Sequence, residues 1–338
     1  MYEYLIVGAA FSRAVLAERI ATQLDKKVII VDKHQHIGGN AYDYFNEEGI
    51  LKHKYGPHRF HTNEKGVFDY LSAFTQWRFH FHRVKTYVDG LLLPILINMD
   101  TLNDLYGLNL SAPEEVQEYF NKVKVHIPSP SNSEEVVINQ VSVDIYNKFF
   151  KGYTLKQREI DPKDLAAIVT EGIPTRTNRD NRYFTDTYQC MPKNGYTALF
   201  NNMLNHPNIF ICLNTDYKDV LALSMFNKVI YTGAIDSFFE YTYRKLPYKS
   251  LRFEHETFSY EDYQGCQQIN YPNGYDFTRI VEWKHATGQI HPYTIITREY
   301  SFLADNKSEK YYPIPRQENH EIYNKYKAKA DKLNSVIF

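Results

Sequence analysis

Two short apolar runs near the start of the chain flank a stretch whose apolar residues recur every four positions. The runs are Tyr4–Val7 and Val28–Val31, and such runs bounded by polar or turn residues are typical of buried strands. Between them, Leu16, Ile20 and Leu24 would lie on one face of a helix. The pattern therefore predicts a strand–helix–strand unit, the building block of an open parallel sheet.

The turn after the first strand keeps one of the three glycines of a dinucleotide-binding turn. Gly8 can make the tight turn, but the second position, which admits a pyrophosphate, is Ala10, and the third, where helix and strand pack closely, is Arg13. A guanidinium at the third position must swing outward or push the helix away. An ordinary strand–helix–strand unit that binds nothing would also fit these residues. Asp32 stands where such folds place the acid that binds a ribose hydroxyl, which favours a nucleotide fold.

The middle of the chain, from about residue 100 to residue 180, has a helical pattern. Ser111-Ala112-Pro113-Glu114 predicts a capping box, and Val116, Phe120 and Val123 form an apolar stripe behind it that we expect to be core. The run from Pro128 to Ser133 predicts a surface loop.

The last third of the chain changes to a strand pattern. From about 240 to 312, short β-branched and aromatic runs alternate with glycine, proline and asparagine, which predicts antiparallel strands. Residues 317–333 predict a final helix with Ile322 and Tyr326 turned inward.

Composition excludes several classes of protein. The 338 residues include 39 basic and 40 acidic side chains without a basic run, so nucleic acid is not an expected partner. No apolar stretch is long enough to span a membrane, and no secretory signal opens the chain. Cys190, Cys212 and Cys266 are scattered, which favours a reduced, cytoplasmic setting, and no metal site is expected.

Several longer stretches carry a resemblance to a known family. Besides the opening Tyr-x-Tyr-Leu-Ile-Val-Gly, they are His36–Asn40, Tyr55–Thr62, Phe149–Thr154, Tyr183–Phe184, Gly195–Thr197, Ile230–Gly233, Thr278–Glu282 and Tyr311–Pro313. In order and spacing they resemble bacterial UDP-galactopyranose mutase, and the resemblance runs from Met1 to Phe338.

The resemblance implies an α/β fold with a Rossmann-like FAD-binding domain, a helical insertion domain and an antiparallel sheet domain. It assigns 1–76, 193–236 and 313–338 to the FAD domain. It assigns 98–182 to the helical domain. The sheet domain would comprise 77–97, 183–192 and 237–312.

The implied activity is the interconversion of UDP-galactopyranose and UDP-galactofuranose. In the family, N5 of reduced FAD attacks the anomeric carbon, UDP leaves, and the sugar adduct opens and recloses as a five-membered ring. The cofactor carries out the covalent chemistry, while the protein positions the sugar and the diphosphate. The product would feed a surface polysaccharide such as lipopolysaccharide, and the family implies a homodimer.

The resemblance also implies roles for individual residues. The cofactor would be held by Gly8, Ala10, Phe11, Asp32, Lys33, Gly38, Gly39, Asn40, His58, His61 and Gly233. The substrate would be held by Phe149, Phe150, Tyr153, Tyr183, Asn270, Arg279 and Tyr312. The catalytic residues would be Arg279, Arg176 and His61.

Each of these roles has a structural alternative. Either histidine of the pair His58 and His61 would also suit a buried, hydrogen-bonded position, and aromatic residues at helical spacing are commonly core. A lone arginine such as Arg279 is commonly a solvated charge, although its guanidinium fork suits a diphosphate.

Four departures from the family pattern bear on activity. The glycine turn carries Ala10 and Arg13, and the family tryptophan five residues after Tyr153 is Arg158, which removes a flat wall from the pocket. An ungapped alignment places Gly172 and Arg176 at two loop arginines of the family. The chain also stops where the family continues into a glycine- and arginine-bearing segment, so we expect an incomplete FAD domain.

Three functions remain open from the sequence. The first is a flavin-dependent mutase. The second is a catalytically impaired relative that keeps the fold and binds a nucleotide sugar or a protein. The third is an oxidoreductase resembling the amine oxidases, against which the uridine-platform aromatics and Arg279 argue.

Overall fold

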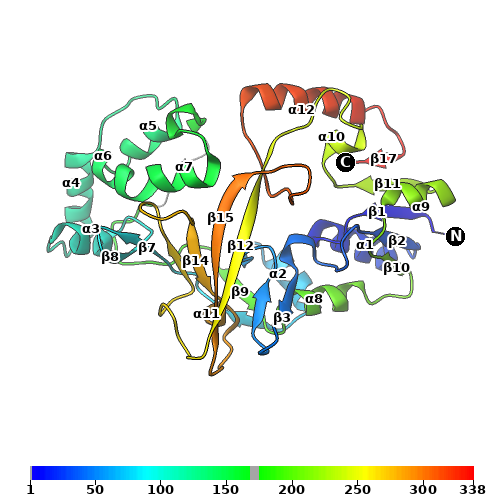
Figure 1. Cartoon of the computed structure of the whole chain (residues 1–338), viewed down its shortest axis with the longest axis horizontal. Helices are drawn as coiled ribbons and strands as arrows, with labels where there is room; N and C mark the ends of the chain where they lie inside the picture. Colours follow the sequence, from blue (N-terminus) through cyan, green and yellow to red (C-terminus); the bar gives the residue numbers. More distant parts are fainter. Residues whose placement is uncertain (1, 168–174) are drawn as a thin grey trace. The chain divides into compact units, whose positions relative to one another are not determined.

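The computed structural model describes residues 2–167 and 175–338, and these form two compact units. The first unit comprises residues 1–79, 190–246 and 317–338, and the second comprises 80–189 and 247–316 (Figure 1). Both helices and mixed sheets are present, which confirms the predicted α/β class. The predicted helical and antiparallel regions both lie in the second unit, so their division into two domains stays a prediction.

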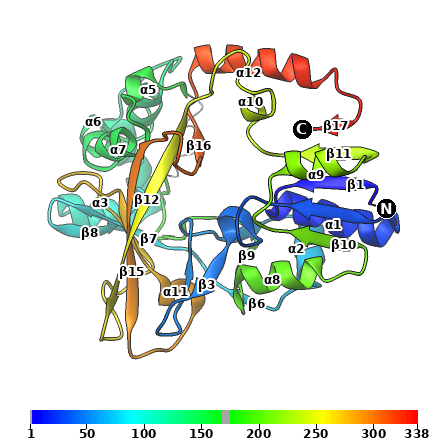
Figure 2. The same ribbon diagram turned by 45° about the vertical axis from the view of Figure 1, so that its right-hand side comes forward.

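A five-stranded parallel sheet forms the centre of the first unit, with strand order β10-β2-β1-β11-β17. Its strands are β1 (Tyr4–Val7), β2 (Val28–Val31), β10 (Ile209–Cys212), β11 (Lys228–Tyr231) and β17 (Val336–Ile337). The sequence predicted β1 and β2 at these bounds. The chain returns to this sheet at β10 and again at β17 only after long excursions, so the sheet is assembled from distant segments (Figure 2).

Helices cover both faces of this sheet. They are α1 (Phe11–Gln23), α2 (Lys65–Ser72), α8 (Gly195–Leu204), α9 (Tyr217–Leu223), α10 (Ile235–Phe238) and α12 (Gln317–Ala330). On one face Ile6 and Ile30 pack with α1 and α8, and on the other Leu5 and Ile29 pack with α9. Alternate strand residues therefore serve separate cores, as the two-residue period of a strand requires.

The buried face of α1 differs from the predicted one. Ile20 is buried, but Leu16 and Leu24 are exposed, and the helix contacts the sheet through Ala14 and Ala17. Small side chains let the helix approach the sheet closely. Of Leu16, Ile20 and Leu24, which recur at four-residue spacing, only Ile20 therefore lies on the buried face.

The final helix and the smaller sheets complete this unit. In α12, Tyr326 is buried as predicted and bonds the backbone of Tyr243 and Arg244, whereas Ile322 is half-buried. The remaining elements are η1 (Gly39–Ala41), β3 (Asp43–Phe45), β4 (Leu51–His53), β5 (Phe60–Thr62), β6 (Trp77–Phe79) and β9 (Tyr188–Pro192).

A seven-stranded sheet forms the second unit, with order β16-β12-β15-β14-β13-β7-β8. All its described ladders are antiparallel except that between β13 and β7. The strands are β7 (Val84–Val88), β8 (Leu91–Pro94), β12 (Tyr248–Phe258), β13 (Gln268–Asn270), β14 (Arg279–Glu282), β15 (Thr294–Leu303) and β16 (Tyr312–Pro313). The prediction of antiparallel strands between residues 240 and 312 is confirmed.

A separate apolar core is built from the helices α3 (Met99–Tyr106), α4 (Pro113–Val123), α5 (Ser133–Ile138), α6 (Val143–Ile145) and η2 (Tyr146–Lys151). The unit also contains α7 (Gly152–Arg158), η3 (Pro162–Asp164) and α11 (Trp283–Thr287). Val116 and Phe120 are buried as predicted. The predicted capping box is wrong in detail, because Ala112 is the N-cap and Glu115, rather than Glu114, bonds back to the amides of Ser111 and Ala112. No described helix is long and apolar enough to cross a membrane.

Gly152 lets α7 approach a neighbouring loop, and its replacement by alanine is expected to destabilise the protein. An added Cβ would lie 2.5 Å from the carbonyl oxygen of Pro272 and against the side chain of Asn273. Overpacking of this kind costs about 1–3 kcal/mol, which exceeds the helix-propensity gain of about 1 kcal/mol. Urea unfolding followed by circular dichroism should show a lower midpoint. Gly66→Ala is the control, because that helical glycine has open space around it and its replacement should not lower the midpoint.

Candidate functional site

The carboxyl end of β1 in the first unit carries a turn held by Asp32. Gly8 has a φ of +104°, a backbone conformation that favours glycine, and its amide donates to the carbonyl of Val31 at 2.7 Å. The amide of Ala9 donates to Oδ2 of Asp32 at 2.8 Å. The acid at the end of β2 thus fixes the turn between β1 and α1.

Asp32 is also bonded to His34. Its Oδ1 accepts the amide of His34 at 2.9 Å and lies 2.7 Å from Nδ1 of the same residue. Burial acts to raise the pKa of Asp32, but the hydrogen bonds from His34 and Ala9 outweigh burial, and the pKa is lowered. The carboxylate is therefore charged at neutral pH and faces the turn as an acceptor.

Arg13 turns across the ends of the strands. Its Nε donates to Oγ1 of Thr232 and its Nη2 to the carbonyl of the same residue, while the Thr232 hydroxyl donates to the carbonyl of Val7 at 3.1 Å. A Cβ built on Gly8 would meet Arg13 Nε at 2.9 Å. The guanidinium thus neither swings outward nor pushes the helix away, but lies beside the turn, half-buried. Burial lowers its pKa, although Asp32 opposes this effect.

These residues fit a dinucleotide in most respects. No side chain caps the N-terminus of α1 and no acid lies in its first turn, so the amides there are left for an anionic ligand. The amide of Gly38 donates to the carbonyl of Ala9 at 2.8 Å, and Gly39 lies against Ala10, whose Cβ would be 2.5 Å from a Cβ on Gly39. Arg13 is the one group in the turn that a bound diphosphate would have to meet or displace.

The other predicted cofactor residues lie at varied depths in this unit. Lys33, Asn40 and His61 are exposed. The ring of Phe11 packs 4.6 Å from that of Phe200, so it belongs to the core beneath the turn. Their roles toward a cofactor stay predictions.

His58 and Gly233 are held by local contacts. The amide of His58 donates to Nδ1 of His53 at 3.0 Å, and its own Nδ1 lies 3.0 Å from the carbonyl of Gly56. A Cβ on Gly233 would meet the hydroxyl of Tyr231 at 2.6 Å. His58 therefore has the hydrogen-bonded position that was the structural alternative to a role at the flavin.

In the second unit, Arg279 pairs with the buried Glu299 on the neighbouring strand. They lie opposite each other in the ladder of β14 and β15, and Arg279 Nη2 is 2.7 Å from Glu299 Oε1. Burial acts to lower the pKa of Arg279, but Glu299 outweighs it, and the pKa is raised. Among the described residues, Arg279 Nε and Glu299 Oε2 lack hydrogen-bond partners although they are buried. Arg279 is therefore not a solvated surface charge, and it has a donor left for a ligand.

Arg279 opens onto a cavity of about 150 Å³, which we call the anion cavity. Arg158 and Lys249 line it with Arg279, so three cations face the same space. Tyr312, Ile160 and residues 313–315 complete most of its wall. The sequence predicted only that Arg158 removes a flat wall from the pocket. In the structure Arg158 is a cation that lines the same cavity as Arg279.

The other predicted substrate residues lie at several places in this unit. Tyr153 interacts electrostatically with Arg279, and burial raises its pKa to about 12. Phe149 is 1 % exposed within the helical core, and Phe150 packs against that core. Both residues thus have the core position that is common for aromatic residues at helical spacing. Tyr183 is partly exposed, and Asn270 is buried on β13 with Oδ1 accepting from Gln268 at 2.8 Å.

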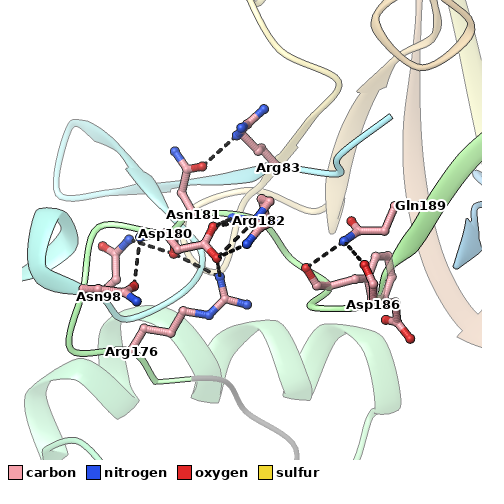
Figure 3. A network of polar contacts seen from close by, with 10 residues as sticks. Arg83, Asn98, Arg176, Asp180, Asn181, Arg182, Asp186 and Gln189 are labelled. Atoms are coloured by element: carbon pink, nitrogen blue, oxygen red, sulfur yellow. Dashed lines mark hydrogen bonds and ion pairs between the residues drawn. The ribbon is translucent and has the colours of Figure 1, made fainter. Parts of the chain in front are cut away.

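Arg176 belongs to a different cluster of this unit. Its Nη1 lies 3.2 Å from Oδ2 of Asp180 and donates to the carbonyl of Asp180 at 3.1 Å, while Arg182 bonds the same carboxylate (Figure 3). It lines a second hollow of about 600 Å³ and not the anion cavity. The structure therefore does not bring Arg176 and Arg279 into one pocket, and Gly172 lies outside the described residues.

The sequence analysis missed Lys249, Glu159 and Glu299. Lys249 is buried and its Nζ lies 2.9 Å from Glu159 Oε1. Glu299 would have been found by pairing the two strands, because it stands directly opposite Arg279. No local signal marks Lys249, which comes from a strand far along the chain.

A cluster of two carboxylates and a histidine lies at the other end of β14, and Glu282 is its buried member. Asp262, Glu282 and His285 each place one potential ligand atom within 4.8 Å of the others. Glu282 already accepts the amides of Tyr263 and Gln264 and the hydroxyl of Thr294. The arrangement is a hydrogen-bonded support for the strand end.

His285 should make stability depend on pH. Its hydrogen bond with Glu282 raises its pKa above the ordinary 6.5, so its contribution to the free energy of unfolding is complete below pH 6.5. That contribution is lost as pH rises through the raised pKa of the folded state. Urea midpoints measured from pH 6 to 9 should fall less in His285→Gln than in the parent chain. His126→Gln, an exposed histidine of the same unit, should leave the slope unchanged, and an unchanged slope in His285→Gln would refute the assignment.

The fold and the two sites define a protein that combines a Rossmann-like unit with a sheet unit that carries a cavity lined by three cations. A family model for UDP-galactopyranose mutase matches residues 148–338, and one for an NAD(P)-binding Rossmann-like domain matches residues 6–74. The chain is 34% identical to a dTDP-fucopyranose mutase of Escherichia coli, covering 100% of this chain and 92% of that one. It is also 34% identical to a probable UDP-galactopyranose mutase of Klebsiella pneumoniae, covering 99% and 87%.

Solved structures of other proteins share the fold of this chain. A reduced UDP-galactopyranose mutase matches with a TM-score of 0.72 at 13% identity, covering 100% of this chain and 89% of that one. A putative protoporphyrinogen oxidase from Exiguobacterium matches with a TM-score of 0.62 at 13% identity, covering 89% and 77%. The chain belongs to the UDP-galactopyranose mutase family.

Proposed function

We propose that this chain is a mutase that interconverts the pyranose and furanose forms of a nucleotide-linked hexose, with UDP-galactose as substrate and FAD as cofactor. The observation that carries the proposal is Arg279, which lines a cationic cavity and whose buried Nε has no hydrogen-bond partner among the described residues. A diphosphate is the anion that such a cavity suits, because a guanidinium fork pairs with two phosphate oxygens. The relatives support the same class of reaction.

The residues of the second unit would bind and orient the nucleotide sugar. Arg279 would hold the diphosphate both before and after its bond to the sugar breaks, so that the leaving group stays in place to return. Glu299 fixes the guanidinium in position through its 2.7 Å ion pair. Tyr153 and Tyr312, neighbours of Arg279, would place their hydroxyls beside the phosphates.

The residues of the first unit would hold the cofactor. Asp32 would accept a ribose hydroxyl, and the amides at the N-terminus of α1 would face the pyrophosphate. When bound and reduced, FAD would supply the nucleophile for the anomeric carbon, so no protein nucleophile is required. Reduced flavin chemistry also suits a cytoplasmic setting. There the furanose product would serve the assembly of a surface polysaccharide, and we expect a homodimer.

A non-catalytic relative that binds a nucleotide sugar is the second candidate. The observation that favours it is Arg13, whose guanidinium lies in the turn where the cofactor diphosphate would sit. Flavin binding separates the two candidates, because only the mutase needs it.

The test is to load the purified chain with FAD, pass it through gel filtration and record its visible spectrum before and after dithionite. The mutase proposal expects a flavin spectrum that elutes with the protein and is bleached on reduction. A colourless protein after loading would leave the non-catalytic relative as the function.

A further inference from the structure

Arg158 is a cation in the wall of the anion cavity, and it has no anionic partner among the residues that the structure describes. It is the last residue of α7 and is half-buried. Within residues 2–167 and 175–338 it forms no ion pair and no hydrogen bond. Its neighbour Glu159 is directed to Lys249 instead, at 2.9 Å.

Among the described residues, the charges around the cavity do not balance. Lys249 pairs with Glu159 and Arg279 pairs with Glu299, which leaves the positive charge of Arg158 over. Burial lowers the pKa of Arg158, which reflects its partial loss of water. A cation withdrawn from water is costly unless an anion lies beside it, so the missing partner is expected to come from a ligand.

The cavity also holds spare hydrogen-bond donors. Among the described residues, Nε of Arg279 and Nζ of Lys249 are buried without hydrogen-bond partners, although each side chain has an ion pair. An anion with several oxygens, placed between these donors and Arg158, would satisfy all three side chains at once.

We propose that Arg158 is a specificity-determining residue that binds an anionic group of the ligand, phosphate or carboxylate oxygens, beside Arg279. The inference rests on the proposed function for the identity of the ligand. The anionic group has two possible sources, the diphosphate itself or a carboxylate on the sugar of a nucleotide-linked uronic acid. The guanidinium plane pairs with either group through two parallel hydrogen bonds.

Calorimetric titration of the full chain with four probes tests the proposal. The probes are inorganic pyrophosphate, UDP, UDP-galactose and UDP-galacturonate. They are titrated into the parent chain, Arg158→Gln and Arg158→Lys. Loss of one charge-assisted contact should weaken binding to Arg158→Gln by about tenfold or more, and Arg158→Lys should recover part of the loss.

The pattern across the probes identifies the source. If Arg158 binds the diphosphate, all four probes weaken together. If it binds a sugar carboxylate, UDP-galacturonate weakens and the other three do not. Equal affinities of the parent chain and Arg158→Gln for all four probes, including no binding to either, would overturn the proposal.

The outcome is separable from that of the proposed function. Arg158-dependent binding of pyrophosphate by a chain that binds no nucleotide would support the anion role and contradict the mutase. Lys307→Gln is the matched control, because it removes one exposed positive charge from the same unit without lining the cavity. Thermal melting of each variant shows whether the fold is kept, and Arg158→Lys preserves the charge should Arg158→Gln fail to fold.

Discussion

Replacement of Arg279 by lysine is expected to lower turnover of the reduced, flavin-loaded protein by about 100-fold or more, with the fold intact. Lysine keeps a positive charge for Glu299, which is 1 % exposed, but it loses the planar fork that pairs with two phosphate oxygens. Chromatographic measurement of UDP-galactofuranose conversion gives the rate. Undiminished turnover in Arg279→Lys would mean that the fork has no part in the reaction.

Arg279→Ala should be more damaging, because it leaves the Glu299 carboxylate buried without its cation. Removal of one partner of a buried pair costs about 3–5 kcal/mol of stability. Adding Glu299→Gln to Arg279→Ala should restore much of that stability but none of the turnover. The pair of variants thus separates the support of the fold from the binding of the diphosphate.

Arg13→Gly is expected to increase the affinity for FAD by about tenfold. The side chain fills the space beside Gly8 and is tied to Thr232, so a bound pyrophosphate would have to displace it. Glycine at this position also restores the close approach of the turn. Fluorescence titration with FAD measures the change.

Arg13→Gln separates size from charge. If the side chain acts as an obstacle, glutamine should leave the affinity for FAD near that of the parent chain. A fall in affinity in both Arg13→Gly and Arg13→Gln would contradict the prediction, and would mean that the guanidinium holds the cofactor diphosphate.

Local sequence predicted β1, α1, β2 and the final helix of the first unit, but not which face of α1 is buried. Tyr4–Val7 and Val28–Val31 form the predicted strands. Short apolar runs of this kind are typical of strands that are buried inside a sheet. Leu16 and Leu24 are exposed because the helix packs on the sheet through alanines. The identity of the buried face depends on the partner surface, which periodicity alone does not describe.

The candidate sites depend on contacts between distant segments. The orientation of Arg13 is set by Thr232, which follows β11, and the anion cavity joins Arg158 to Lys249 and Arg279. The resemblance to a family placed Arg279 in a site, but it could not show that Arg158 adds a charge there. Arg176 pairs with Asp180, four residues further along the chain, and so it belongs to a local cluster and not to the anion cavity.

The central claim is that this chain is a working mutase, and the most direct test is the conversion of UDP-galactofuranose by the FAD-loaded protein under dithionite. We predict that UDP-galactopyranose appears only when dithionite is present and that its formation is nearly abolished in Arg279→Lys. Absence of product from protein whose flavin is bound and reduced would contradict it.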